Sequence, residues 1–298
     1  MGMIFSNGTE SGNIGLTKER KEASDLTIEV YKEFLERMTF EESQEKSFAT
    51  KGFIIQPEKL EIRDSEGEEI WTQEAFKFIE TEKWDLDTVH PGLWQNATLN
   101  HLFGLFEVTD SNYKGEHKIY QVRGYDLANI TFIKSDNGWI VLDTLTSKQA
   151  AEAALELMES VFGSLNIKAV IISHNHADHY GGMEAFVKQE QVLHQSLNGT
   201  VRLIVPEHFL KYVVSENLYA GTAMRRRSEY QFGTFLQKDA KGLVSSGLGM
   251  TASGGNVSFV LPGDIITNTG QEMIIDGIRM IFQLTPSAEA PSDMNIYF

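Results

Sequence analysis

Apolar residues recur along the chain in short runs separated by turn signals. Between residues 99 and 145, four such runs follow one another, at 102–108, 119–122, 130–133 and 139–142. Each run has the length and residue types of a β-strand. Asp136-Asn137-Gly138 stands between two β-branched runs, so it predicts a hairpin joining the last two strands.

The spacing of apolar residues then changes to that of a helix. Ser147 opens a predicted helix through about Phe162, with Gly163 at its end. Its predicted buried side consists of Ala154, Leu155, Leu157, Met158 and Val161. The apolar run 169–172 follows as another strand. Because a helix separates the runs 139–142 and 169–172, we expect these two strands to be parallel.

The flanking segments extend this pattern on both sides. A helix of three to four turns is predicted from Asp25, followed by short strands at 52–55 and 60–62. Beyond residue 200 we predict helices at 206–214 and around 225–227, and strands at 203–205, 257–261, 273–275 and 278–284. The order of sheets and helices predicts an α/β sandwich of two sheets, with its site at the strand ends.

We divide the chain into three parts. Residues 1–24 are polar and rich in Gly, Ser and Asn, which is typical of a flexible segment. Residues 25–98 supply a helix and strands that pack on the core, and residues 99–298 form the main domain. The last residues, 294–298, alternate like a strand with no polar tail, so we expect a fragment of a longer protein. A C-terminal strand docked into the sheet is the alternative.

Composition narrows the possible functions. The chain has 298 residues, 41% of them hydrophobic, and no apolar run as long as a membrane helix. It lacks the features of a secretory signal, so we expect a cytoplasmic protein, with a periplasmic or secreted one as the alternative. The net charge of −16 argues against nucleic-acid binding. An anionic substrate would need a locally positive pocket, which divalent ions could supply.

Residues 174–179 read His-Asn-His-Ala-Asp-His and directly follow the predicted strand 169–172. Three imidazoles and a carboxylate in six residues are costly to bury, whereas a transition metal binds both groups. His174 and His176 are expected on the same side of the backbone, where they converge on one ion. Asp178 and His179 are expected to diverge and to serve a second ion nearby. The alternative is a set of unrelated loop histidines.

Two features flank this histidine loop. Gly181-Gly182 would let the chain turn before a short helix over about 182–189. Asp143 ends the run 139–142, and two interpretations are open for it. It either supports the metal loop from behind its ligands or caps the helix that begins near Ser147.

The pattern His-x-His-x-Asp-His resembles the motif of the metallo-β-lactamase superfamily, and Asp143 resembles that family's supporting Asp. Further runs resemble the alkyl sulfatase branch and extend from about residue 50 to the last residue. These runs lie at 91–95, 104–106, 120–127, 215–221 and 285–291. The resemblance implies an αββα two-sheet sandwich, incomplete at the C-terminus of this chain.

The resemblance also implies a function. It implies zinc-dependent hydrolysis of linear alkyl sulfate esters by a metal-activated water, with two Zn²⁺ ions per complete site. It makes His174, His176, Asp178, His179 and Glu289 metal ligands, with Asp178 also catalytic. The family needs another carboxylate ligand, a further His and sulfate-binding side chains from sequence beyond this chain. A dimerisation region and a C-terminal lipid-carrier-like domain would also lie there, and the full-length protein is expected to be a homodimer.

Other assignments remain open. Arg226, within Arg225-Arg226-Arg227, is a candidate substrate-binding residue, although consecutive helical residues diverge and a solvated face explains them equally. The glycine loop 247–251 could offer backbone amides to sulfate. A thioesterase or lactamase on the same scaffold is one rival function, whereas the charge argues against a nuclease. A metal-binding but catalytically silent segment is the other rival.

Overall fold

The computed structural model of the protein describes residues 4–5, 21–37, 42–82, 88–109, 115 and 117–298. The segment 1–24 predicted to be flexible lies mostly outside these residues. The α-helices are α1 Asp25–Arg37, α2 Glu42–Thr50, α3 Phe78–Thr81, α4 Pro91–Asn100, α5 Lys148–Phe162, α6 Ala177–Tyr180, α7 Phe209–Val214 and α8 Gly221–Phe232. No described helix is both long and apolar enough to cross a membrane.

The strands form one large sheet, one small sheet and two short pairs. The large sheet contains, in spatial order, β12 Asp264–Ile266, β10 Arg202–Pro206, β9 Ile167–Ile171, β8 Trp139–Leu142, β7 Ile130–Lys134, β6 Ile119–Arg123, β5 Gly104–Glu107 and β2 Phe53–Ile55. The small sheet contains β13 Gln271–Ile275, β14 Ile278–Leu284 and β15 Met294–Tyr297. The pairs join β3 Glu61–Arg63 to β4 Glu69–Thr72 and β1 Ile4–Phe5 to β11 Gly255–Asn256.

The large sheet combines an antiparallel and a parallel half. The predicted hairpin joins β7 and β8, and α5 then crosses to β9, which runs parallel to β8. Strands β10 and β12 continue the parallel half. The carboxyl ends of β8, β9 and β10 therefore meet at one edge of the sheet, where open α/β sheets hold their sites.

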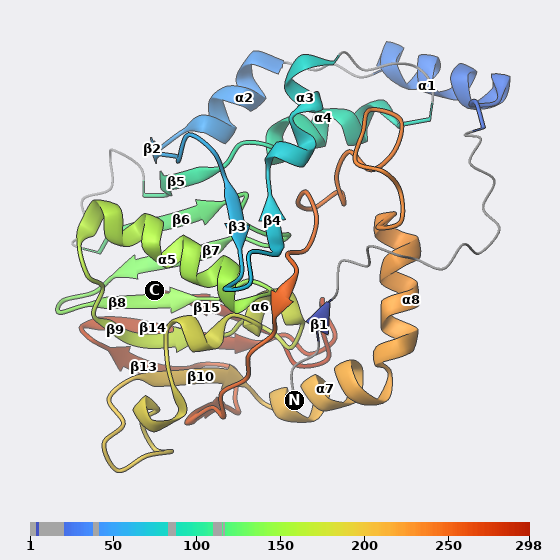
Figure 1. Ribbon diagram of the computed structural model, residues 1–298. Coiled ribbons are helices and arrows are strands. Elements are labelled where there is room, and N and C mark those ends of the chain that lie inside the picture. The colour runs from blue at the N-terminus through green and yellow to red at the C-terminus, as the bar shows by residue number, and fades with distance from the viewer. Residues whose placement is uncertain (1–3, 6–20, 38–41, 83–87, 110–114, 116) are drawn as a thin grey trace.

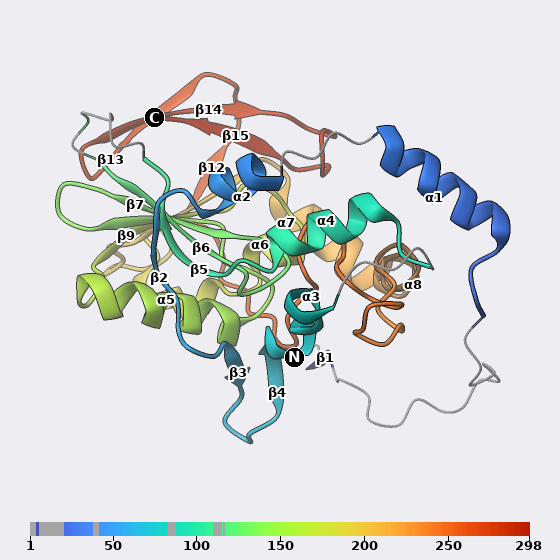
Figure 2. The same ribbon diagram turned by 90° about the horizontal axis from the view of Figure 1, so that it is seen from above.

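The two faces of the large sheet are covered differently (Figures 1 and 2). Helix α5 lies on one face, and β13, β14 and β15 lie against the other. Buried side chains form one cluster on the α5 side, including Val141 and Val170, and a second cluster between the sheets, including Ile140 and Ile171. This alternation along β8 and β9 fills both interiors and confirms the two-sheet sandwich.

One helical layer of that sandwich is present in the described residues. The small sheet turns its other face to solvent, and Ile274 and Tyr297 are 74% and 60% exposed there. The N-terminal part also contributes to the core sheet, because β2 pairs with β5 at its edge.

The structure differs from the predictions for residues 257–261 and for Val161. Residues 257–261 form no strand, because their polar groups bond to loops: Ser258 donates to the Gly181 carbonyl, and the Leu261 N–H donates to the Gln189 side chain. The sheet continues instead through β12. Val161 is 39% exposed, because Phe162 packs on Tyr120 and Trp139 at the last turn of α5.

Candidate metal centre

The histidine loop begins where β9 ends and lies beside the end of β8. Asp143 follows β8, and its N–H donates to the Ile171 carbonyl of β9. On the other side, His174 forms an isolated antiparallel bridge with Asp293, and the Met294 N–H donates to the Ser173 carbonyl. The loop is therefore fixed between two backbone segments that are far apart in the sequence.

His174, His176 and Glu289 form the first group of potential ligands. The distance from His174 Nε2 to His176 Nδ1 is 3.2 Å. Glu289 Oε1 lies 3.8 Å from His174 Nε2 and 4.0 Å from His176 Nδ1. Ligand atoms around a tetrahedral zinc ion lie about 3.4 Å apart, since each bond is about 2.0 to 2.2 Å long. The three atoms fit one ion with small movements.

Asp178 and His179 form the second group. The structure contradicts the expected divergence, because Asp178 Oδ2 lies 3.3 Å from His179 Nε2. Both residues belong to α6, which begins inside the histidine loop, so helical rather than extended geometry decides where they point. The rings of His174 and His179 lie 4.0 Å apart between centroids, so the two groups are neighbours.

Asp143 supports the loop through three hydrogen bonds. It accepts from the backbone N–H and the hydroxyl of Ser173, both at 2.8 Å, and it lies 2.8 Å from His179 Nδ1. This contact leaves His179 Nε2 for a metal, as is usual when a carboxylate orients a metal-binding imidazole. Ser147, and not Asp143, caps the start of α5, because the Ser147 hydroxyl accepts a hydrogen bond from the Ala150 N–H.

The backbone around Asp143 is strained. Asp143 and Leu145 have φ angles of 60° and 64°, in the left-handed region that non-glycine residues rarely adopt. Thr144 between them donates from its N–H and its hydroxyl to the His179 carbonyl, at 2.7 and 3.1 Å. These bonds join the end of β8 to α6, and strain held in this way is typical of functional sites.

The two glycines allow close approach of the backbone rather than a sharp turn. Neither has a positive φ. A Cβ on Gly181 would lie 1.9 Å from the Thr146 carbonyl oxygen, and one on Gly182 would lie 2.1 Å from that of Thr144. The predicted helix over 182–189 is wrong: the chain forms only short 3-10 turns, Met183–Ala185 and Gln189–Gln191.

Burial and neighbouring charges shift the pKa values of this cluster in opposite directions. Burial lowers the pKa of His174, and the adjacent His179 lowers it further. Burial also acts to lower the pKa of His179, but Asp143 and Asp178 outweigh it and raise that pKa well above its usual range. Burial would raise the pKa of Asp178, yet the hydrogen bond and charge of His179 lower it overall. These shifts favour the neutral form of His174 and the charged forms of Asp178 and His179.

Supporting residues were not predicted from the sequence. The Ser173 hydroxyl lies 2.9 Å from His174 Nδ1, which orients Nε2 toward Glu289. Asn175 is fully buried; its amide donates to Glu216, and its oxygen accepts from the Ser292 N–H at 3.1 Å. Their position within or beside the histidine loop was the only available signal, because each partner is distant in the sequence.

The structure does not connect Arg226 with the histidine loop. Arg226 is exposed on α8, and among the described residues no hydrogen bond or ion pair joins it to residues 174–179. Its neighbour Arg225 pairs with Glu229 at 2.9 Å, as expected for a solvated helical face. Gly249, from the glycine loop 247–251 that could offer backbone amides to sulfate, lines a separate cavity together with Arg123.

Residues 123–292 match the family described as the metallo-β-lactamase superfamily. A linear primary-alkylsulfatase of Pseudomonas sp. is 38% identical over 96% of this chain and 41% of its own length. An alkyl/aryl-sulfatase of Saccharomyces cerevisiae is 38% identical over 93% of this chain and 41% of its own length. The solved structure of a stereoselective inverting sec-alkylsulfatase from Pseudomonas sp. superposes with a TM-score of 0.83 and 37% identity, over 94% of this chain and 42% of that one. The chain thus spans about two fifths of the length of these relatives.

Proposed function

Since the chain belongs to the metallo-β-lactamase superfamily, we propose that it hydrolyses linear alkyl sulfate esters to alcohol and sulfate, using two zinc ions. The observation that carries the proposal is the pair of adjacent ligand groups, one of His174, His176 and Glu289 and one of Asp178 and His179. The similarity to proteins named alkylsulfatases supports the choice of substrate.

The donor types support zinc. Imidazole nitrogen and carboxylate oxygen are both good zinc ligands, and the chain has no cysteine to offer a softer set. In the proposed site His174, His176 and Glu289 hold the first ion. Asp178 and His179 hold the second, and Asp143 keeps the His179 ring in the tautomer that presents Nε2.

The bound ions would supply Lewis acidity that lowers the pKa of a bound water toward about 7 and would balance charge on the departing sulfate. The protein's own side chains position that chemistry. Asp178, with its lowered pKa, stays ionised at neutral pH and is placed to orient a water beside the imidazoles. The side chain of Glu289 is 67% exposed, so solvent reaches the centre from its side.

Charge explains why the site needs metal before it accepts this substrate. The chain carries a net charge of −16, and Asp143, Asp178 and Glu289 add local negative charge to the centre. A sulfate ester is an anion and is repelled by such a site. Two divalent cations reverse the local sign, so metal and substrate binding should occur in that order.

Sulfate release from dodecyl sulfate below its micellar concentration tests the proposal. We expect zinc-dependent turnover that chelation abolishes and that the His176→Ala variant lacks. Oxygen-18 water then reports whether carbon or sulfur is attacked, because label enters the alcohol only on attack at carbon.

Two outcomes would contradict the proposed function. Faster cleavage of a thioester or a lactam than of the sulfate ester would indicate a different hydrolase on this fold. Bound zinc without turnover of any of the three substrates would indicate a metal-binding segment without catalysis.

A further inference from the structure

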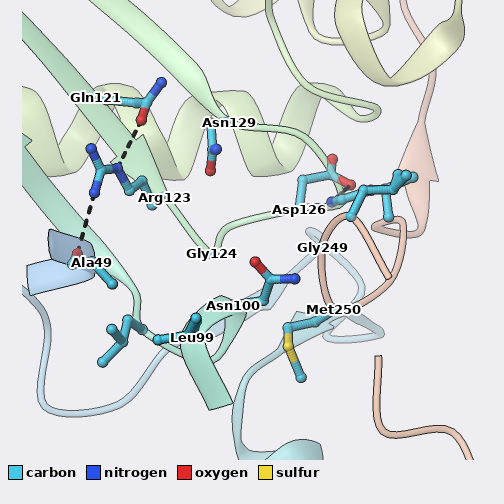
Figure 3. A pocket seen from close by; sticks show the side chains of 13 residues that line it. Ala49, Leu99, Asn100, Gln121, Arg123, Gly124, Asp126, Asn129, Gly249 and Met250 are labelled. Carbon is cyan, nitrogen blue, oxygen red and sulfur yellow. Dashed lines mark hydrogen bonds between the residues drawn. The ribbon is translucent and has the colours of Figure 1, made fainter. Parts of the chain in front are cut away.

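A second cavity, separate from the histidine cluster, opens between α2, α4 and the ends of β6 and β7 (Figure 3). Its volume is about 280 Å³, and its polar lining includes Asn100, Gln121, Arg123, Asp126 and Asn129. The loop containing Gly249 closes another side. Two segments noted in the sequence, 120–127 and 247–251, thus meet at this cavity although the proposed hydrolysis uses neither.

The cavity lies on the same sheet edge as the histidine loop but several strands away. Thr131, beside the cavity at the start of β7, pairs with Leu142 of β8, and Leu142 pairs with Ile171 of β9. Arg123 is on β6, three strand positions from β9. Strands are spaced about 4.8 Å apart, so the two sites are separated by about 14 Å along the sheet.

Arg123 is held in a fixed position at the cavity wall. Its Nε donates to the Gln121 side-chain oxygen at 2.7 Å, and its Nη1 donates to the Ala49 carbonyl at 3.3 Å (Figure 3). The guanidinium carbon lies 4.4 Å from the centre of the Phe106 ring. These contacts leave Nη2 free of any described partner, and a held guanidinium loses little entropy on binding an anion.

The charge of Arg123 is not balanced by a described carboxylate. Burial alone lowers its pKa, and no described acidic side chain forms an ion pair with it. Asp126 also lines the cavity, but its two oxygens already accept five hydrogen bonds, from Leu127, Thr146 and Ser253. A partly buried cation loses part of its hydration, which is unfavourable when no counterion replaces the water. An anion bound beside Arg123 offsets this loss through charge-assisted hydrogen bonds.

The other walls suit an anion with a short apolar tail. Figure 3 shows Asn100 and Asn129 among the side chains that line the same cavity as Arg123, whose guanidinium group is turned toward Gln121 and Ala49. Leu99, Leu102 and Met250 supply apolar surface to the same lining. Because one water occupies about 30 Å³ of liquid, the cavity has room for about nine waters and hence for an oxyanion with a few methylene groups.

We propose that this cavity is an oxyanion site, in which Arg123, Asn100 and Asn129 bind a sulfate group independently of the metal centre. The ligand is either free inorganic sulfate or the headgroup of an alkyl sulfate. Nothing in the site requires a bound metal, so it can be tested apart from the proposed hydrolysis.

The test is equilibrium dialysis of radiolabelled sulfate with the full chain after removal of metal by chelation. We expect saturable binding that weakens at least tenfold in Arg123→Gln and less in Arg123→Lys, which keeps the charge but loses the planar fork. Arg279→Gln is the matched control, because Arg279 is exposed on the small sheet and pairs with Glu272 there. It should bind sulfate like the wild type.

A second variant covers the case in which Arg123→Gln fails to fold. Asn129 is exposed and lines the cavity, so Asn129→Asp should fold and weaken sulfate binding by adding a negative charge to the cavity lining. Unchanged binding in this variant, or in a folded Arg123→Gln variant, overturns the proposal. Loss of binding in His176→Ala also overturns it, because the sulfate would then occupy the histidine cluster.

Hexyl sulfate identifies the source of the anion. Tighter binding of hexyl sulfate than of inorganic sulfate supports an alkyl sulfate headgroup with its tail on the apolar wall. Equal affinities support free sulfate as the ligand. The metal-free protein is used in both measurements, so that hydrolysis does not remove the ester.

Discussion

At the scale of single residues, one ring nitrogen of His174 and one of His179 contact a neighbouring side chain. The other nitrogen of each ring is left for a metal ligand bond. His174 Nδ1 lies beside the Ser173 hydroxyl, and His179 Nδ1 lies beside Asp143, which also accepts from that same hydroxyl. Asp143 therefore influences two of the three imidazoles, one directly and one through Ser173. Its effect on metal binding should exceed that of an exposed carboxylate.

Asp143→Asn tests this role. The amide keeps the size of the side chain and tolerates the left-handed backbone, but it removes the charge that holds His179. We expect zinc affinity to fall by about 10- to 100-fold, the range found for supporting residues of metal ligands. Competition with a fluorescent zinc chelator measures the change.

Asp136→Asn is the matched control, because Asp136 is 53% exposed and its nearest ion-pair partner, His117, is 3.8 Å away. It should bind zinc like the wild type. If Asp143→Asn also kept full affinity, Asp143 would serve the backbone of the loop and not the metal.

At the scale of elements, α6 must lie very close to the loop that follows β8. Gly181 ends α6, and its backbone lies against Thr146. Gly181→Ala would place Cβ 1.9 Å from the Thr146 carbonyl, so either α6 or the 144–147 loop must move. We expect a loss of about 1 to 3 kcal/mol in the free energy of unfolding, as for other overpacked sites. Urea unfolding measures it.

Gly221→Ala provides the comparison for this variant. Gly221 begins α8, and an added Cβ there would meet nothing within 4 Å. Alanine is the better helix former, so this change should be neutral or stabilising. Equal effects of the two substitutions would mean that α6 does not depend on close approach at Gly181.

The elements that the sequence predicts well are those determined by local patterns. The hairpin at Asp136-Asn137-Gly138 and the helix after Ser147 form where turn residues, caps and apolar spacing agree. Residues 257–261 have the apolar content of a strand, but hydrogen bonds to Gly181 and Gln189 fix them as a loop. These partners lie 77 and 72 residues away in the sequence, so no local pattern reveals them.

In the candidate site, too, some features follow from local sequence patterns and others depend on distant partners. The spacing of His174 and His176 predicted that they converge, and their facing nitrogens are 3.2 Å apart. Asp178 and His179 approach each other because α6 begins inside the loop. A helix of four residues is too short to produce a recognisable pattern in the sequence. Asn175 and its partner Glu216 come together only through the fold.

At the scale of the whole molecule, the bound metal should link segments that are distant in the chain. Glu289 lies on the loop before β15, whereas the histidines follow β9, so an ion held by both joins the two sheets of the sandwich. Ligands that bind only the folded state stabilise it, by about 2.7 kcal/mol at 100 times the dissociation constant. Zinc should therefore raise the unfolding temperature.

Differential scanning calorimetry of the metal-free chain with and without zinc measures this linkage. We expect the rise in wild type to disappear in His176→Ala and to persist in His208→Asn, because His208 is 59% exposed and asparagine tolerates its left-handed backbone. The rise should also shrink as the pH falls, since protons compete with zinc for imidazole, and Asp143 and Asp178 hold the pKa of His179 well above its usual range. A rise in the unfolding temperature that His176→Ala retains in full would place the stabilising zinc ion outside the cluster of His174, His176 and Glu289.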